Sequence, residues 1–395
     1  MKKIRLGDIA TLITKGTTPT TIGFSFVDTG VNFVKIESIS ENGEFLSDKF
    51  AHITDECDNK LKRSQLEEND ILFSIAGAIG RTAIVPRSIL PANTNQALAI
   101  IRIPQNAINL RFVLYALQSQ AVEEQSEKQK QGVAQLNLSL KNIADILIPL
   151  VSSEKQDEIV RNLAAVDTAI AIRKEQIRLI DQVVKSRFIE LFGDIVLNPF
   201  GWEKDYLGVV CDVRDGTHDS PHYHSTGFPL VTSKNVTGGE IDLTDCSLIS
   251  EADFNKINER SKVNMGDIIM PMIGTVGKPV IVNVEPNFAI KNVSLIKFKD
   301  DSRVLNTFVR SLLQSDYFDD AVLSKVRGGT QKFISLGDIR KLAVIVPPME
   351  LQEQFAAFVE QTDKSKYYSS LSFRYCQAAA NTYRQEWMTC RTSDF

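Results

Sequence analysis

The stretch KRSQLEENDILFSIAGAIGRTAIV, residues 62–85, recurs without a gap as ERSKVNMGDIIMPMIGTVGKPVIV, residues 259–282. Eight of the 24 aligned positions are identical, among them an aspartate, Asp70 in the first copy and Asp267 in the second. These two aspartates lie 197 residues apart. Because a repeat of this length is the signature of two copies of one structural unit, it decides the fold before any single motif is considered.

Four further pairs of segments keep the same order at nearly the same spacing. They are 32–39 with 229–236, 95–103 with 292–300, 112–120 with 308–316, and 152–160 with 348–356. A chain of 395 residues is also longer than one hydrophobic core usually supports. The sequence therefore predicts two similar domains.

Each copy begins with short β-rich runs separated by glycine turns, and continues with a short helix, a proline-marked strand and a long helical segment. We expect an α+β protein with two pseudo-repeated mixed α/β domains, joined by two long helices. The predicted limits are 1–150 for the first domain, 151–192 for a central helical spacer, 193–348 for the second domain and 349–395 for a C-terminal helical spacer.

The two long helices carry apolar side chains at alternating spacings of three and four residues, which is the pattern of a coiled-coil seam. An antiparallel pair is the expected arrangement, and the alternative is that each helix only covers its own domain. The middle of the second seam is polar. The seam residues include Ile159, Leu163, Val166, Ile170 and Ile177 in the first helix, and Phe355, Val359, Phe373 and Trp387 in the second.

The composition is 43% hydrophobic and 24% charged, and no apolar run is long enough to span a bilayer. The first residues carry two lysines but no long apolar stretch, so we expect no secretory leader and a cytoplasmic protein. The five cysteines form no C-x-x-C pair, which favours reduced thiols over a zinc site.

The net charge of −4 argues against a simple nucleic-acid binder, since neutralising phosphates usually needs an excess of lysine and arginine. Any DNA site in this chain must be a local patch or be completed by a partner.

A search for catalytic motifs leaves no candidate. Asn198–Gly201 has the start of an adenine-methyltransferase motif but lacks its second proline, and Gly274–Lys278 lacks the spacing of a phosphate loop. His218, His222 and His224 have spacing that a metal would accept, but the first copy has no histidine there, so a polar recognition loop is the preferred interpretation. We expect no catalytic centre and no metal.

Basic, hydroxyl and amide residues recur in equivalent loops of both copies, as two copies of one DNA-binding surface require. Any one of them is more often a solvated surface side chain, so the recurrence carries the argument. In the first copy they are Lys15, Gly16, Thr17, Lys35, Arg81, Asn93, Asn95, Gln96, Lys130, Gln131 and Gln135. In the second copy they are Arg214, Thr217, His218, Lys234, Asn235, Lys278, Lys291, Asn292, Arg327, Gly329, Gln331 and Lys332.

The order of short motifs along nearly the whole chain resembles the specificity subunits of type I restriction-modification enzymes. The first half has L-G-D-I, G-T-T-P, N-D-I-L, N-Q-A-L, I-P-L, E-K-Q-D-E-I-V and F-I-E-L-F-G. The second half has D-G-T-H, G-D-I-I, G-G-T-Q, V-P-P and L-Q-E-Q.

This resemblance implies that each domain is a target-recognition domain for one half of a gapped double-stranded DNA site, and that the helices set the gap. It implies two modification (methyltransferase) subunits as partners, which bind S-adenosylmethionine, and restriction subunits that use ATP and Mg²⁺. The chain itself would hold no cofactor. The alternatives are a recognition module of another methyltransferase-based phage-defence system and a repeat scaffold that binds protein; a self-sufficient enzyme has the least support.

Overall fold

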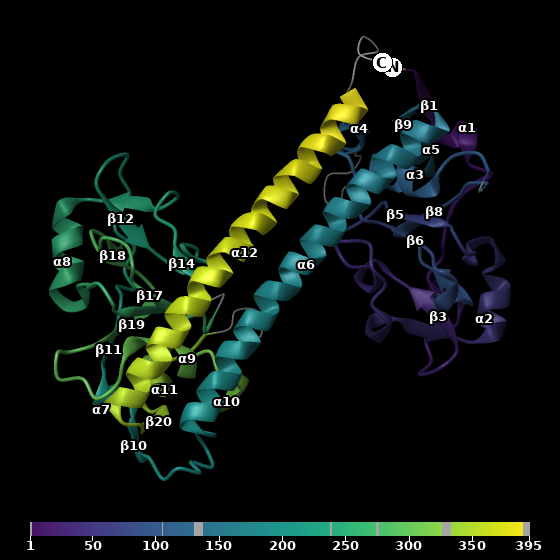
Figure 1. The fold of residues 1–395 in the computed structure, drawn as a ribbon. Coiled ribbons are helices and arrows are strands. Elements are labelled where there is room, and N and C mark those ends of the chain that lie inside the picture. Colours follow the sequence, from purple (N-terminus) through teal and green to yellow (C-terminus); the bar gives the residue numbers. More distant parts are fainter. Residues whose placement is uncertain are drawn as a thin grey trace. The chain divides into compact units, whose positions relative to one another are not determined.

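A computed structural model describes residues 2–104, 106–129, 137–237, 239–273, 276–325 and 333–389 (Figure 1). The chain divides into two compact units. Unit 1 comprises Met1–Lys174 with Leu371–Phe395, and unit 2 comprises Glu175–Ser370. The four-part division predicted from the sequence stays a prediction, since the compact units cut across both long helices.

The described residues of unit 1 form three small sheets. The four-stranded antiparallel sheet has the order β2 (Leu12–Lys15), β8 (Leu98–Arg102), β5 (Ile71–Ser74) and β6 (Thr82–Ile84). The three-stranded sheet has the order β4 (Ala51–Ile53), β3 (Val31–Val34) and β7 (Ala92–Thr94), with β3 and β7 parallel. The third sheet pairs β1 (Lys3–Arg5) with the proline-marked strand β9 (Leu147–Pro149).

Unit 2 repeats these sheets strand for strand. Its four-stranded sheet is β11 (Asp212–Asp215), β19 (Val293–Lys297), β16 (Ile268–Pro271) and β17 (Val280–Ile281). Its three-stranded sheet is β15 (Ser247–Ile249), β12 (Phe228–Val231) and β18 (Ala289–Ile290), and β10 (Glu203–Tyr206) pairs with β20 (Ala343–Val346). A hairpin of β13 (Val236–Thr237) and β14 (Glu240–Ile241) is added. The predicted repeat is confirmed.

The helices follow the same repeated order. Unit 1 has α1 (Leu6–Ile9), α2 (Asp55–Lys60), α3 (Leu110–Leu117), α4 (Gln120–Gln129) and α5 (Leu140–Ala144). Unit 2 has α7 (Leu207–Val210), α8 (Glu251–Ser261), α9 (Asn306–Leu312), α10 (Asp316–Ala321) and α11 (Leu336–Arg340). The long helices are α6 (Ser153–Phe192) and α12 (Met349–Thr389).

The aspartate shared by the two copies holds the four-stranded sheet together. Asp70 is buried and accepts hydrogen bonds from Arg102 of β8 through both carboxylate oxygens, at 2.7 and 2.8 Å. Asp267 is buried in the same way and accepts from Lys297 of β19 at 2.6 Å. Each carboxylate also accepts a backbone N–H from the turn before its own strand. The identity of these residues between the copies therefore reflects a structural ion pair.

The starts of the long helices are fastened by a glutamine that is also repeated. Gln156 of α6 accepts from the backbone N–H of Asn109 at 2.9 Å, and Gln352 of α12 accepts from that of Leu305 at 2.8 Å. Both side chains are buried and donate to a backbone carbonyl as well. This bond orients each helix on the short helix that follows the four-stranded sheet.

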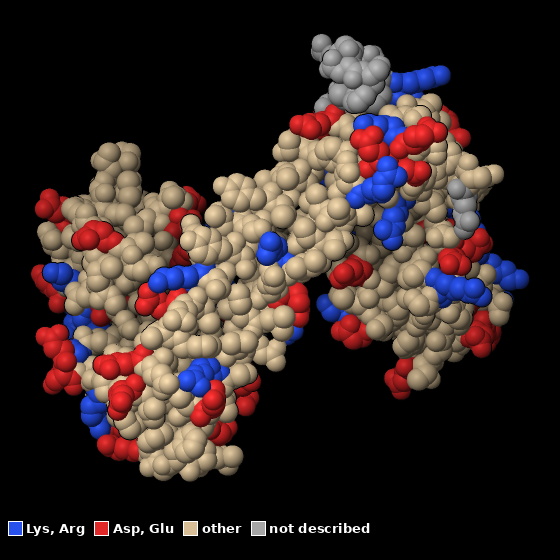
Figure 2. Space-filling view, viewed as in Figure 1, with Lys and Arg blue, Asp and Glu red and all other residues tan. Residues whose placement is uncertain are grey.

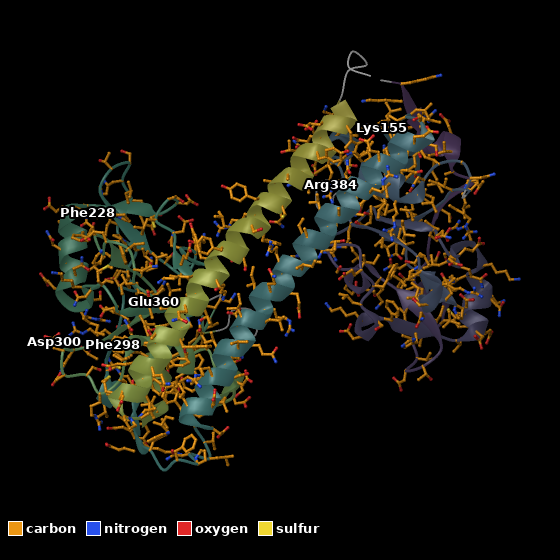
Figure 3. All side chains as sticks on the ribbon, in the orientation of Figure 1. Lys155, Phe228, Phe298, Asp300, Glu360 and Arg384 are labelled. Atoms are coloured by element: carbon orange, nitrogen blue, oxygen red, sulfur yellow. The ribbon has the colours of Figure 1, made fainter. Side chains whose placement is uncertain are left out.

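The two long helices pack side by side in opposite directions. In unit 1, Asn162 of α6 donates to the hydroxyl of Tyr383 at 2.9 Å, and Arg384 of α12 donates to the Asp167 carboxylate at 3.1 Å (Figure 3). In unit 2, Lys366 in the first half of α12 pairs with Asp181 in the second half of α6. The predicted antiparallel pair is confirmed.

The ends of the seam do more than join the helices, because they complete the two cores. Trp387 lies 5.0 Å from Phe112 (ring centroids) in the core of unit 1, although α12 follows the second copy in sequence. Phe188 and Phe192 of α6 lie in the core of unit 2, where both contact Phe308. Each long helix therefore also packs into the core of the other unit. The alternative, in which each helix only covers its own domain, is wrong.

Burial varies along the seam. Its ends are fully buried and its middle is half-buried, and the polar positions of α12 lie in that half-buried middle. The buried seam residues are Ile159, Leu163, Phe188, Phe355, Val359, Ala380 and Trp387, and the half-buried ones include Val166, Ile170, Ile177 and Phe373.

Replacing Asp70 by alanine should lower the free energy of unfolding of unit 1 by about 3 kcal/mol, because Arg102 loses a buried partner. Glu67 also pairs with Arg102 but is 63% exposed, so Glu67→Ala should cost less than about 1 kcal/mol. Urea unfolding followed by the fluorescence of Trp387, in a Trp202→Phe background, measures both. Equal effects of the two variants would contradict the structural role of Asp70.

Phe188→Ala should destabilise unit 2 by about 3–5 kcal/mol, because a buried aromatic ring is removed from its core. Val183→Ala on the same helix, where the side chain is 49% exposed, is the matched control. Hydrogen exchange of the strand amides gives the readout for each unit separately. Loss of protection in β16 and β19 is expected with Phe188→Ala, and an equal loss in β5 and β8 of unit 1 would overturn this assignment.

Candidate nucleic-acid interface

Two loops meet at one place in unit 1. The chain that leaves β2 (residues 15–18) lies against the connection between β7 and β8 (residues 95–97). The backbone N–H of Gly16 donates to the Asn95 carbonyl at 3.1 Å, and the Thr18 hydroxyl donates to the Gln96 side-chain oxygen at 2.5 Å. A Cβ on Gly16 would lie 1.8 Å from the Thr94 carbonyl oxygen. Only glycine allows this approach, so Gly16 builds the surface on which its neighbours stand.

The same two loops meet in unit 2. Residues 215–218, which leave β11, lie against residues 291–292 between β18 and β19. A Cβ on Gly216 would lie 2.4 Å from the Ile290 carbonyl oxygen, and the backbone N–H of Asn292 donates to the Thr217 carbonyl at 3.1 Å. We call residues 15–18 with 95–97, and 215–218 with 291–292, the loop pair of each unit.

The loop pairs bring together many of the residues proposed from the sequence. In unit 1 these are Lys15, Gly16, Thr17, Asn95 and Gln96, and in unit 2 they are Thr217, His218, Lys291 and Asn292. In unit 2 the His218 ring lies between two oxygens, 2.9 Å from Asn292 Oδ1 and 2.9 Å from Asp215 Oδ2. Lys291 is largely buried and donates to the Ser220 hydroxyl at 2.6 Å.

Two of the proposed DNA contacts are contradicted by burial. The Asn93 side chain is completely buried and donates to the Asp58 carboxylate at 2.8 Å, so it ties the end of α2 to β7. Asn235 is 7% exposed, and its side-chain oxygen accepts from the backbone N–H and the hydroxyl of Thr232. Both amides are occupied inside the fold, so the prediction that they contact DNA is wrong.

Three of the basic residues predicted to contact DNA make contacts within the fold that stabilise local structure. Arg81 donates to the backbone carbonyls of Ile36 and Ile39, at 3.2 and 2.8 Å. The Lys35 ammonium lies 4.5 Å from the centre of the Phe26 ring. Arg214 donates to Asp212 at 2.6 Å, and this bond lowers the pKa of the Asp212 carboxyl.

The remaining proposed residues are exposed or undescribed. Lys234 and Lys278 are exposed. Lys130, Gln131, Gln135, Arg327, Gly329, Gln331 and Lys332 lie outside the described residues.

Beside each loop pair the surface is hollowed. The hollow of unit 1 has a volume of about 620 Å³ and is lined by Thr17, Ile22, Phe24, Lys60, Leu61, Arg63 and Ser64. The hollow of unit 2 has a volume of about 210 Å³ and is lined by Thr217, Asp219, Ser220, Pro221, Asp253, Lys256, Ile257, Arg260 and Ser261. Three lining positions are the same in both: a threonine of the loop pair, an arginine and the serine that follows it.

The helix that forms the far wall of each hollow is packed on the three-stranded sheet. In unit 2, Phe254 of α8 stacks on Phe228 of β12 with ring centroids 4.2 Å apart. In unit 1, Cys57 of α2 is buried with Val31 and Phe33 of β3. Arg63 and Arg260 were not among the proposed residues, although both belong to the repeated block 62–85 and 259–282. An exposed arginine that is identical in both copies was the signal for them.

The charge pattern is mixed. Figure 2 shows basic and acidic groups interspersed over the visible face of both units. A surface with mixed charges suits a DNA-binding site that is confined to a local patch.

Two of the thiols, those of Cys211 and Cys246, lack the character of nucleophiles. Burial, together with Asp212, raises the pKa of Cys211 to about 12, and burial beside Asp242 raises that of Cys246 to about 11. A catalytic cysteine needs the opposite shift. Within the described ranges, no three His, Cys, Asp or Glu side chains are grouped as metal ligands.

None of the helices in the described part of the chain combines the length and the apolar character that a bilayer span requires.

The sequence profile described as the type I restriction modification DNA specificity domain matches residues 1–182 and again residues 199–367. The chain belongs to this family.

Individual relatives agree with this assignment. The type I restriction enzyme MjaIX specificity subunit of Methanocaldococcus jannaschii is 24% identical over 332 residues, which cover 78% of this chain and 74% of that protein. The MjaVIII specificity subunit of the same organism is 23% identical over 380 residues, with 91% and 85% covered. The crystal structure of the S subunit of a type I restriction-modification system from M. genitalium matches with a TM-score of 0.54 at 14% identity, over 99% of this chain and 96% of that one, and shows the same fold.

Gly216→Ala should push the loop pair of unit 2 apart, because the new methyl group would lie 2.4 Å from a backbone oxygen that cannot move independently. Backbone amides of residues 216–218 and 290–293 should exchange hydrogen faster. Gly337→Ala is the control, since only a serine hydroxyl lies within 4 Å of its Cβ position. If the two variants exchanged alike, the glycine would not be required by the loop contact.

Proposed function

We propose that this chain is the DNA-recognition subunit of a type I restriction-modification enzyme, and that it reads a bipartite, gapped site with one half assigned to each unit. The observation that carries the proposal is the duplication of the loop pair and its hollow. The backbone that builds the surface is the same in both units and three lining side chains are identical, whereas the other side chains on it differ. This is what two readers of different sequences need.

The residue types of the loop pairs suit contact with DNA. Thr17 and Gln96 in unit 1, and Thr217 and Asn292 in unit 2, can donate to and accept from base edges or phosphates. At the position before the loop glycine, unit 1 has Lys15 and unit 2 has Asp215. With such different side chains, the two half-sites are expected to differ, so the full site is asymmetric.

The partners supply what this chain lacks. We propose that two modification subunits bind to it and carry S-adenosylmethionine, and that restriction subunits add ATP- and Mg²⁺-dependent cleavage, all in the cytoplasm. The chain itself would take no part in catalysis. With a net charge of −4, it also depends on these partners for many phosphate contacts.

Mapping of DNA methylation by single-molecule sequencing tests this function. Cells that express the chain together with the methyltransferase encoded beside it should methylate a gapped, two-part motif, and cells without the chain should not. An unchanged methylation pattern would leave a protein-binding scaffold as the better interpretation. A continuous motif would favour a module of another methyltransferase system.

Removing one heptad from the middle of α6 and its packing counterpart from α12 should change the gap and leave both half-sites intact, because the seam keeps its register. The methylation map gives the readout. An altered half-site with an unaltered gap would contradict the role of the helices as a ruler.

A further inference from the structure

The arginine that is identical in the two hollows is held very differently in unit 1 and unit 2. Arg63 follows α2 and is exposed, and among the described residues its side chain has no hydrogen-bond or ion-pair partner. Arg260 lies in the last turn of α8, and its guanidinium pairs with the Asp215 carboxylate. The arginine side chain can therefore change its orientation to contact a ligand in unit 1, whereas in unit 2 the ion pair fixes its orientation.

Arg260 is fixed through its backbone as well. Arg214 donates to the Arg260 carbonyl at 2.7 Å, and Arg214 is itself held by Asp212 at 2.6 Å. The next residue, Ser261, is buried and donates to the Ile257 carbonyl at 3.0 Å. The guanidinium nevertheless remains at the surface, with the Arg260 side chain 65% exposed.

The difference arises at the position before the loop glycine. Asp215 is 13% exposed and accepts from both Arg260 and the His218 ring, so one carboxylate links α8 to the loop pair. In unit 1 this position is Lys15, which repels an arginine instead of holding it. The hollow of unit 1 is lined by Lys60 and Arg63 and by no acidic residue, whereas that of unit 2 has Asp219 and Asp253 among its lining residues.

These charges predict different ligands for the two arginines. An arginine anchored by a carboxylate is held in one orientation, so that its remaining coplanar N–H groups can make bidentate contact with the N7 and O6 acceptors of guanine. A free arginine in a basic hollow suits the phosphate backbone, where charge matters more than orientation.

We propose that the two hollows are DNA-contact sites in which the repeated arginine has two roles: Arg260, positioned by Asp215, reads a guanine in one half-site, and Arg63 binds a backbone phosphate. This inference rests on the proposed function, and it names the residues with which each unit would act.

The test uses the assembled methyltransferase that contains the full-length chain. With Arg260→Ala, the preference for guanine at one position of one half-site should fall by about 10- to 100-fold, and the other half-site should be unchanged. Asp215→Asn, which leaves Arg260 in place, should relax the same position to a smaller extent. Relaxation of that position is a readout that a general loss of stability would not produce.

Arg63→Ala should leave the motif unchanged and weaken binding to all sequences alike. The slope of log K against log salt concentration should become smaller by about 1, as expected for one lost phosphate contact. Arg111→Ala and Lys341→Ala remove exposed cations outside both hollows and are the matched controls for unit 1 and unit 2.

The outcomes separate this inference from the proposed function. If the unaltered chain directs no gapped motif, the proposed function fails. If it does, but Arg260→Ala leaves both half-sites as they were, or Arg63→Ala changes the identity of a base, this inference alone is overturned. Should the Arg260→Ala complex fail to assemble, an unchanged motif with Asp215→Asn would overturn it equally.

Discussion

The fold depends on the packing of two antiparallel helices into the cores of both units. Phe188 and Phe192 at the end of α6 contact Phe308 and Phe355 in unit 2, and Trp387 at the end of α12 contacts Phe112 in unit 1. Buried aromatic rings of this kind contribute several kcal/mol each. Each core therefore takes part of its stability from a helix that continues into the other unit, and neither helix can be removed without cost to both.

In each repeated unit, some residues fix the sheets and the loop backbone, and others can vary without disturbing them. Asp70 with Arg102, and Asp267 with Lys297, fix the four-stranded sheets, while Gly16 and Gly216 let the loop pairs close against the neighbouring backbone. The position before each of those glycines is free to differ, and it does: Lys15 in one unit is replaced by Asp215 in the other. A recognition protein gains from this arrangement, because specificity can change without disturbing the sheet.

Much of the fold could be predicted from the sequence, because repeats and helical seams are periodic patterns that can be recognised in the sequence alone. The two similar domains and the antiparallel pair of α6 and α12 followed from it. The site was harder. Asn93 and Asn235 have side chains that suit DNA contact, but nothing in their residue type shows that their amides are used inside the fold. Arg260 was not among the predicted residues because it lies on a helix, whereas the predicted DNA contacts were expected in loops. Only the structure brings it to Asp215.

Under the proposed function, two separate surfaces of one chain contact two separate segments of the same DNA. Hydroxyl-radical footprinting of the assembled methyltransferase on a genomic fragment that carries the methylated motif tests this most directly. Two protected segments are expected, one over each half-site, with a less protected gap between them. Arg260→Ala should weaken protection of one segment only. A single continuous footprint, or equal loss of protection over both segments, would contradict it.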